Sequence, residues 1–182
     1  MDFRSETYPA PPGVTVSLVE HTFHGIVSQL ASELAMEALA EMLGRAPRWS
    51  DFAVLETCRK ADLEPAGQLM LMTVGERLTR FLAAETMGQV VDYVGAAENP
   101  DYRRDQVAAQ EVGHATGRTP GSSEYRIAFY RRLVQEFPDF PVALRAGDIS
   151  LTHCRILDDE TRDTDDPVAL RKIAHHALLA AQ

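Results

Sequence analysis

The sequence contains little of what several large classes of protein need. Only two cysteines, Cys58 and Cys154, occur among 182 residues, which is too few for a disulfide scaffold and favours a reducing cytoplasm. No apolar run approaches the roughly 20 residues that a membrane-spanning helix requires. The first residues, MDFRSETYPAPPG, have no basic stretch followed by an apolar one, so they do not resemble a signal peptide. We therefore predict a cytoplasmic protein without membrane contact. Residues 1–16 are expected to form a flexible leader ahead of the first helix.

Sequence signatures of catalysis and of metal binding are also missing. There is no glycine-rich phosphate loop and no nucleophile elbow. The closest histidine pairs, His21 with His24 and His175 with His176, fall on separate predicted helices, whereas a zinc site needs four converging ligands. The acidic stretch Asp158–Asp166 lacks the spacing of an EF-hand loop. We predict no catalytic residues, no metal site and no cofactor.

An excess of positive charge is absent as well. The chain carries a net charge of −9, whereas a protein that wraps nucleic acid over a broad face usually carries a basic excess. Residues 1–100 hold 7 basic and 14 acidic side chains, and residues 146–182 hold 4 and 7. Residues 101–145 hold 7 arginines against 6 acidic side chains. Any contact with nucleic acid must therefore be local, and we expect it in this middle segment.

What the sequence has instead is helical periodicity. Apolar residues recur at spacings of three and four from Phe23 to Met42, and Gly44 and Pro47 follow them, which predicts one amphipathic helix. A shorter helix is expected over Ser50–Lys60. A long central helix is expected from Pro65 to Asn99, with Gly88 as a point where it could break in two. We predict an all-α fold of one continuous domain, in which residues 17–100 form an N-terminal helical arm or bundle and residues 101–182 a helix-turn-helix-like subdomain.

The stretch Gln106–Phe137 is the centre of the prediction. Asp105 is expected to cap a helix over Gln106–Thr116, and Thr119-Pro120 is a typical start for the next helix. Two helices joined by a short polar turn have the outline of a helix-turn-helix unit. Further helices are expected over Val142–Ala146, after Ser150 and after Asp166-Pro167.

Arginines and hydroxyls in and beside this unit are the candidates for contact with double-stranded DNA, because such side chains bind phosphates and base edges in helix-turn-helix proteins. The candidate residues are Arg103, Arg104, Arg118, Ser122, Ser123, Arg126, Arg131 and Arg132. The alternative is a solvated helix face that packs on neighbouring helices. Arg126 in particular falls inside the apolar arc, where it could pair with an internal acid.

A family resemblance supports the first interpretation. ALRAGDISLTHCRIL (Ala143–Leu157), followed by Asp165-Asp166-Pro167, resembles the signature of domain-of-unknown-function family two-two-two, the thirteen-E-twelve repeat proteins. This family is common in actinobacteria and their phages and often precedes an HNH endonuclease domain. The likeness extends through YRIAFYRRLVQEFPDFPVAL and EVGHATGRTP, and more loosely over about Ser50 to Gln182. Arg145–Cys154 also resembles an element that follows the helix-turn-helix of ParB-type partition proteins.

Three functional hypotheses follow. The resemblance implies a DNA-binding or HNH-nuclease-accessory domain without catalytic activity of its own. The second hypothesis is a protein-interaction or dimerisation module, in which the acidic helical surface and the long central helix bind a partner protein or a second copy. The third is an enzyme fragment whose HNH half is missing, since no HNH signature follows in this chain.

Overall fold

The computed structural model describes residues 16–95 and 102–181, with side chains from residue 25 and, after the gap, from residue 105. These residues form helices and no strand, so the all-α prediction is confirmed. In chain order the helices are α1 (Val16–Leu43), α2 (Asp51–Cys58), α3 (Pro65–Val94), α4 (Tyr102–Thr116), α5 (Pro120–Glu136), α6 (Asp139–Ala146), α7 (Leu151–Thr161) and α8 (Pro167–Ala181).

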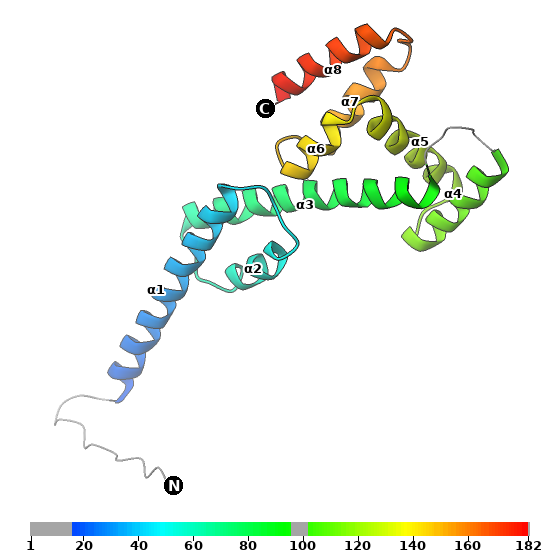
Figure 1. Ribbon diagram of the computed structural model, residues 1–182. Helices are drawn as coiled ribbons and strands as arrows, with labels where there is room; N and C mark the ends of the chain where they lie inside the picture. Colours follow the sequence, from blue (N-terminus) through cyan, green and yellow to red (C-terminus); the bar gives the residue numbers. More distant parts are fainter. Residues whose placement is uncertain (1–15, 96–101, 182) are drawn as a thin grey trace, which may run out of the picture.

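The long central helix α3 is the element on which the others assemble (Figure 1). It starts with Pro65 in its first turn, where the missing N–H of proline costs nothing, and runs for 30 residues without interruption. Gly88 does not break it, although the sequence left that possibility open. The helix ends at Val94 and is followed by Gly95, whose φ of 76° is accessible to glycine at little cost. The predicted end at Asn99 lies outside the described residues.

Two hydrophobic clusters lie along α3. The N-terminal cluster joins the last two turns of α1, helix α2 and the first half of α3 around Leu39, Cys58 and Leu78. The C-terminal cluster joins the second half of α3 with α4 to α7, and α8 packs on its edge. Its most deeply buried side chains include Met87, Leu133, Phe140, Leu144, Ile149 and Cys154. Since α3 contributes to both clusters, they are parts of one continuous structure.

Arg77 of α3 ties the two clusters together. Its guanidinium donates to the carbonyl oxygens of Leu43 at 2.7 Å and of Ala146 at 3.1 Å, the last residues of α1 and α6. Carbonyls at a helix C-terminus lack intrahelical partners and carry partial negative charge, so a cation stabilises them. The close approach requires Gly147 (φ 81°), because a Cβ there would lie 3.1 Å from Arg77. One side chain thus fixes the ends of two helices against α3.

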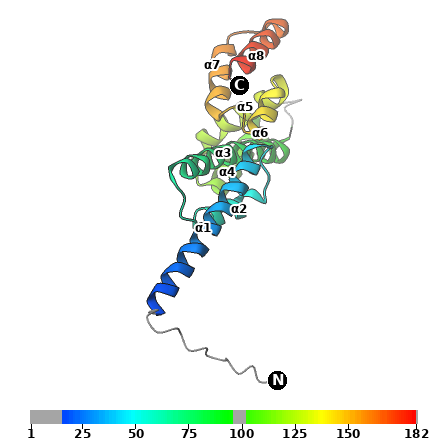
Figure 2. The ribbon, with the colours of Figure 1, turned by 90° about the vertical axis from the view of Figure 1, so that its left-hand side faces the viewer.

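Only the C-terminal part of α1 packs on this body. Ala35, Leu39 and Met42 are buried, whereas Gly25–Ala31 contains almost only exposed residues. Figures 1 and 2 show the preceding turns of α1 projecting away from the other helices. The contact between α1 and α3 is tight where it occurs, since a Cβ on Gly67 would lie 2.6 Å from Met36 Sδ.

The C-terminal helices follow the predicted order with shifted boundaries. Helix α6 starts at Asp139, three residues before the prediction, because Pro141 fits in its first turn. Ser150 precedes α7 as expected, and its N–H donates to His153 Nδ1 at 3.0 Å. Asp166 caps α8 by accepting a hydrogen bond from the Val168 N–H at 2.8 Å. None of the side chains of α8 is buried, so this helix is held less firmly than the others.

Among residues 16–95 and 102–181, we find no helix that combines the length and the apolar character required to span a membrane.

Candidate functional site

Helices α4 and α5 pack against each other and are joined by a three-residue connection, Gly117–Thr119. Gly117 has a φ of 65°, and the Thr119 side chain caps α5 by accepting from the Ser122 N–H at 3.3 Å. Gly113 allows the close approach, because a Cβ there would lie 2.9 Å from the Arg118 carbonyl oxygen and 3.2 Å from Ser123 Oγ. The predicted pair of helices with a tight turn is present. Its action as a helix-turn-helix unit stays a prediction.

The structure corrects the predicted start of this pair. Helix α4 begins at Tyr102, so Asp105 lies in its first turn and is not the residue before it. Its carboxylate accepts a hydrogen bond from Arg131 Nη2 at 3.0 Å. Asp105 therefore serves as the counter-ion of a buried arginine.

The structure separates the predicted DNA-contacting residues into three groups. Arg103 and Arg104 have side chains outside the described ones. Arg118 and Ser122 are exposed at the turn and at the start of α5. The remaining four are turned wholly or partly inward: Ser123, Arg126, Arg131 and Arg132.

Arg131 is buried at the point where α3 ends. Its Nε donates to the Gly95 carbonyl at 3.0 Å and its Nη2 to the Val94 carbonyl at 3.1 Å, in addition to Asp105. The side chain therefore neutralises the C-terminus of α3 and connects it to the first turn of α4. Because its guanidinium donates hydrogen bonds to these partners, Arg131 does not face the solvent as a DNA contact would require.

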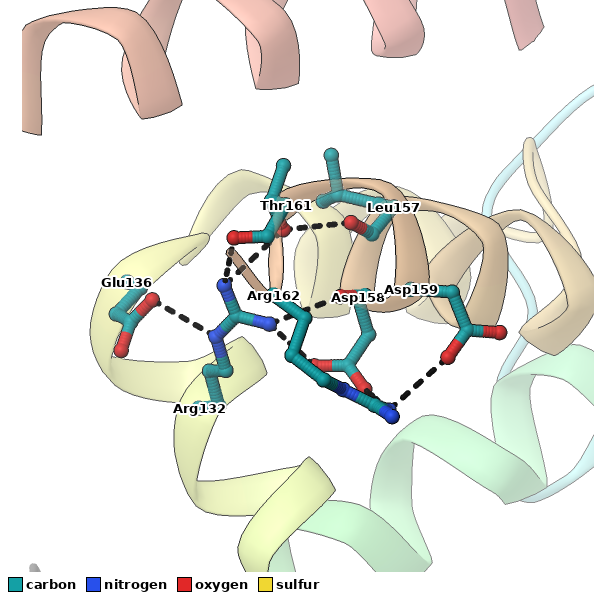
Figure 3. A network of polar contacts seen from close by, with 7 residues as sticks. All are labelled: Arg132, Glu136, Leu157, Asp158, Asp159, Thr161 and Arg162. Atoms are coloured by element: carbon teal, nitrogen blue, oxygen red, sulfur yellow. Dashed lines mark hydrogen bonds and ion pairs between the residues drawn. The ribbon is translucent and has the colours of Figure 1, made fainter. Parts of the chain in front are cut away.

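Arg132 is the centre of a larger network between α5 and α7 (Figure 3). Its N–H groups donate to both the carboxylate (2.8 Å) and the carbonyl (2.9 Å) of Asp158, to the carbonyl of Thr161 at 2.9 Å, and to Glu136 at 3.0 Å. Asp158 is buried and also accepts from Arg162 at 3.3 Å. Burial opposes the charge of Arg132, but the hydrogen bonds with Asp158 and Glu136 raise its pKa. The network stabilises the docking of α7 and keeps Arg132 cationic.

The predicted positive patch is therefore much smaller than the sequence indicated. Arg126 lies with its guanidinium 5.1 Å from the centre of the Tyr130 ring, a cation–π contact within its own helix. Ser123 is fully buried against Gly113. Of the candidates with described side chains, Arg118 and Ser122 are the ones free to meet a phosphate.

A cleft of about 740 Å³ lies beside this network, between α5, the loop after α7 and the start of α8. Charged side chains of both signs line it: Arg132, Arg162, Arg171, Glu136, Asp158 and Asp165. Because these charges balance and Arg132 and Arg162 are already paired, the lining favours neither an anion nor a cation.

A group of exposed apolar side chains lies elsewhere, on the projecting part of α1. Ile26, Val27, Leu30 and Leu34, which we call the α1 stripe, are 52%, 48%, 53% and 66% exposed. Successive residues of a helix turn by 100°, which places the α1 stripe on a different side of α1 from the buried Ala35, Leu39 and Met42. Sequence reasoning missed this surface because it assigned both sets to one apolar face. The signal was present in the adjacent pair Leu34 and Ala35, which cannot share a face.

The cysteines provide no reactive centre in the folded protein. Both are free and buried. Burial raises the pKa of the Cys58 thiol, and raises the pKa of the Cys154 thiol to about 12. Within the described residues, no three or more His, Cys, Asp or Glu side chains are grouped so that they could hold a metal ion.

Comparison with known proteins leaves the family open: no protein-family model, no curated protein and no solved structure matches this chain. The resemblance of Ala143–Leu157 to domain-of-unknown-function family two-two-two therefore stays a prediction.

Proposed function

We propose that this protein is a helical protein-interaction module whose contact element is the projecting half of α1. The observation that supports this proposal is the α1 stripe, four large apolar side chains that are about half exposed or more and belong to neither hydrophobic cluster. Apolar side chains grouped on one exposed face are typical of protein interfaces. Two buried free thiols fit the reducing cytoplasm that we propose as its location.

The free half of α1 gains stability if another helix covers it. Residues 16–34 extend over about 28 Å, and an isolated helix of this length is marginally stable in water. Gly25 weakens it further, by about 1 kcal/mol relative to alanine. Covering the exposed area of the α1 stripe would contribute about 3–6 kcal/mol before the entropic cost of association. Binding and ordering of this segment are therefore expected to occur together.

Selection from a library of displayed helical peptides tests the proposal. Binders selected on the full chain should lose binding to Leu30→Asp, which places a charge in the α1 stripe. They should keep binding to Ser28→Asp, which adds the same charge on the opposite side of the helix, about 160° from Leu30. Binders that do not respond to Leu30→Asp would contradict the proposal, provided that sedimentation shows no self-association through α1.

Double-stranded DNA is the second candidate ligand, supported by one observation. The start of α5 is exposed and presents Arg118 and Ser122 beside a helix N-terminus, where backbone N–H groups favour a phosphate. The resemblance of Ala143–Leu157 to a family found ahead of nuclease domains favours the same ligand. The contact would be local and mostly to phosphates, since the chain as a whole is acidic.

A gel shift with random duplex DNA tests this second candidate. Arg118→Glu should weaken binding, and Arg155→Glu, an exposed arginine on α7, is the matched control. Arg131 and Arg132 are unsuitable for this test, because their removal would disturb the fold. Absence of any shift at about 50 mM salt, or equal loss in both variants, would exclude DNA as the ligand of α5.

A further inference from the structure

We infer that the partner of the α1 stripe is a helix of a different protein that carries lysine or arginine beside its own apolar seam. This inference rests on the proposed function of α1. A second copy of this chain is the alternative occupant, and the two differ in charge.

The spacing of the α1 stripe fits a helix as partner. Ile26 and Leu30 are four residues apart, and Val27 and Leu34 form a neighbouring row seven residues apart. In the sequence the alternation of three and four continues upstream through Phe23, Val19 and Val16. A repeat of this kind forms the seam of a coiled coil, in which the facing helix inserts its side chains between these rows.

The charged residues of α1 are all negative, and two of them lie on the face of the seam. Helix α1 contains Glu20, Glu33, Glu37 and Glu41 and neither lysine nor arginine. Glu33 and Glu37 follow Leu30 by three and seven residues, so they continue the same face, and both are exposed. Glu41 is paired with Arg45 at 3.0 Å. Glu33 and Glu37 make no ion pair in the part of the chain that the structure describes.

Charges on the contact face help to decide which helices pair, because opposite charges that face each other attract and like charges repel. Two copies of α1 can offer each other glutamate alone. Each copy also carries a net charge of −9, which opposes their approach. A partner with lysine or arginine opposite Glu33 and Glu37 would pair with them while its apolar seam covers the α1 stripe.

Two synthetic peptides with the same apolar residues and opposite charge test this inference. The first has the native sequence of residues 16–41, and the second carries Glu20→Lys, Glu33→Lys, Glu37→Lys and Glu41→Lys. Each is titrated into the full chain by calorimetry or fluorescence anisotropy. We expect the lysine peptide to bind at least about tenfold more tightly at low salt, and the difference to shrink as salt is added.

Variants of the full chain separate seam binding from general attraction to an acidic protein. Leu30→Asp makes the chain more negative, so unspecific attraction of the lysine peptide would increase, whereas seam binding would be lost. Ser28→Asp changes the net charge equally, on the opposite side of α1, and this control should keep binding. Glu33→Lys together with Glu37→Lys should reverse the preference in favour of the native peptide.

Each remaining outcome has a distinct meaning. Equal binding of the two peptides, or self-association of the full chain that Leu30→Asp abolishes, would overturn the inference and leave α1 as an interaction element. Binding of neither peptide, by a chain that stays monomeric in sedimentation, would overturn both the inference and the proposed function.

Discussion

Several arginines of this protein connect helices to one another through hydrogen bonds and ion pairs. Arg77 and Arg131 each donate hydrogen bonds to carbonyl oxygens at the C-termini of helices, and Arg132 donates hydrogen bonds to the C-terminal part of α7. Arg45 forms a bidentate ion pair with Asp51, with N···O distances of 2.8 and 2.9 Å, at the connection between α1 and α2. The planar guanidinium suits these positions because it offers several donors in a fixed geometry. Lysine could not replace it without loss of hydrogen bonds.

Arg132→Ala should destabilise the fold strongly. The substitution leaves the buried carboxylate of Asp158 without its main counter-ion, and breaking a buried pair costs about 3–5 kcal/mol. Urea denaturation monitored by circular dichroism measures the loss in free energy of unfolding. Arg162→Ala removes an exposed partner of the same carboxylate and should cost much less. Equal losses would contradict the central role of Arg132.

The pair of Arg45 and Asp51 predicts a dependence of stability on pH. Hydrogen bonds from Arg45 lower the pKa of the Asp51 carboxyl in the folded state, below the value of about 3.9 expected in the unfolded chain. The pair therefore stabilises the fold above about pH 4, and this contribution is lost as the pH falls through the lowered pKa.

Thermal unfolding of wild type and Asp51→Asn checks this expectation. Asp51→Asn should lower the midpoint near neutral pH, and the gap to wild type should narrow as the pH falls through the lowered pKa of Asp51. Asp62→Asn, which replaces an exposed carboxylate in the loop after α2, is the control. A gap that stays constant across this range would show that the pair does not contribute through its charge.

Among the helices, the contact between α4 and α5 depends most clearly on a single small residue. Gly113 faces the Arg118 carbonyl and the buried Ser123 hydroxyl across the turn. The space that a methyl group would need is already filled by backbone. By contrast, a Cβ added to Gly75 or Gly88 of α3 would meet open space within 4 Å. Glycine is therefore required for packing at position 113 of α4 and is not required at positions 75 and 88 of α3.

Gly113→Ala should destabilise the protein by about 1–3 kcal/mol, because the added methyl group forces α5 away from α4. Gly88→Ala should stabilise it by about 0.5–1 kcal/mol, since alanine restricts the unfolded chain and meets open space in α3. Both are measured as shifts in the urea midpoint. Stabilisation by Gly113→Ala would mean that α4 and α5 are less tightly packed than the structure indicates.

Periodicity predicted which segments are helical, and local rules predicted several of their ends. Thr119-Pro120, Ser150 and Asp166-Pro167 start α5, α7 and α8 as expected. Which side of a helix faces inward could not be predicted in the same way, because that depends on neighbours that are distant in sequence. Arg131 looked like a solvent-exposed cation until the C-terminus of α3 and Asp105 were placed beside it.

For the molecule as a whole, the two hydrophobic clusters predict unequal local stability. Amides between Val74 and Val90 lie in the stretch of α3 packed by both clusters, whereas those of Gly25–Leu34 lie in the projecting part of α1. Local opening is easiest where few apolar contacts hold a helix. The stability of α1 is therefore expected to depend on its partner.

Hydrogen exchange followed by mass spectrometry measures this difference. Amides of Gly25–Leu34 should exchange much faster than those of Val74–Val90 in the isolated protein, and should slow down when the lysine peptide is added. The Leu30→Asp variant is the control and should show no slowing. Equal protection of both segments in the isolated protein would mean that α1 is stable without a partner.

The continuity of α3 has a geometric consequence. At a rise of 1.5 Å per residue, its 30 residues span about 45 Å. The body that anchors α1 is built near one end of this rod, and helices α4 and α5 pack near the other. A single unbroken helix transmits no hinge motion, so two ligands bound at these places would be held at a fixed separation. In that arrangement α3 works as a spacer of set length, and the second ligand would bind with an effective concentration determined by that length.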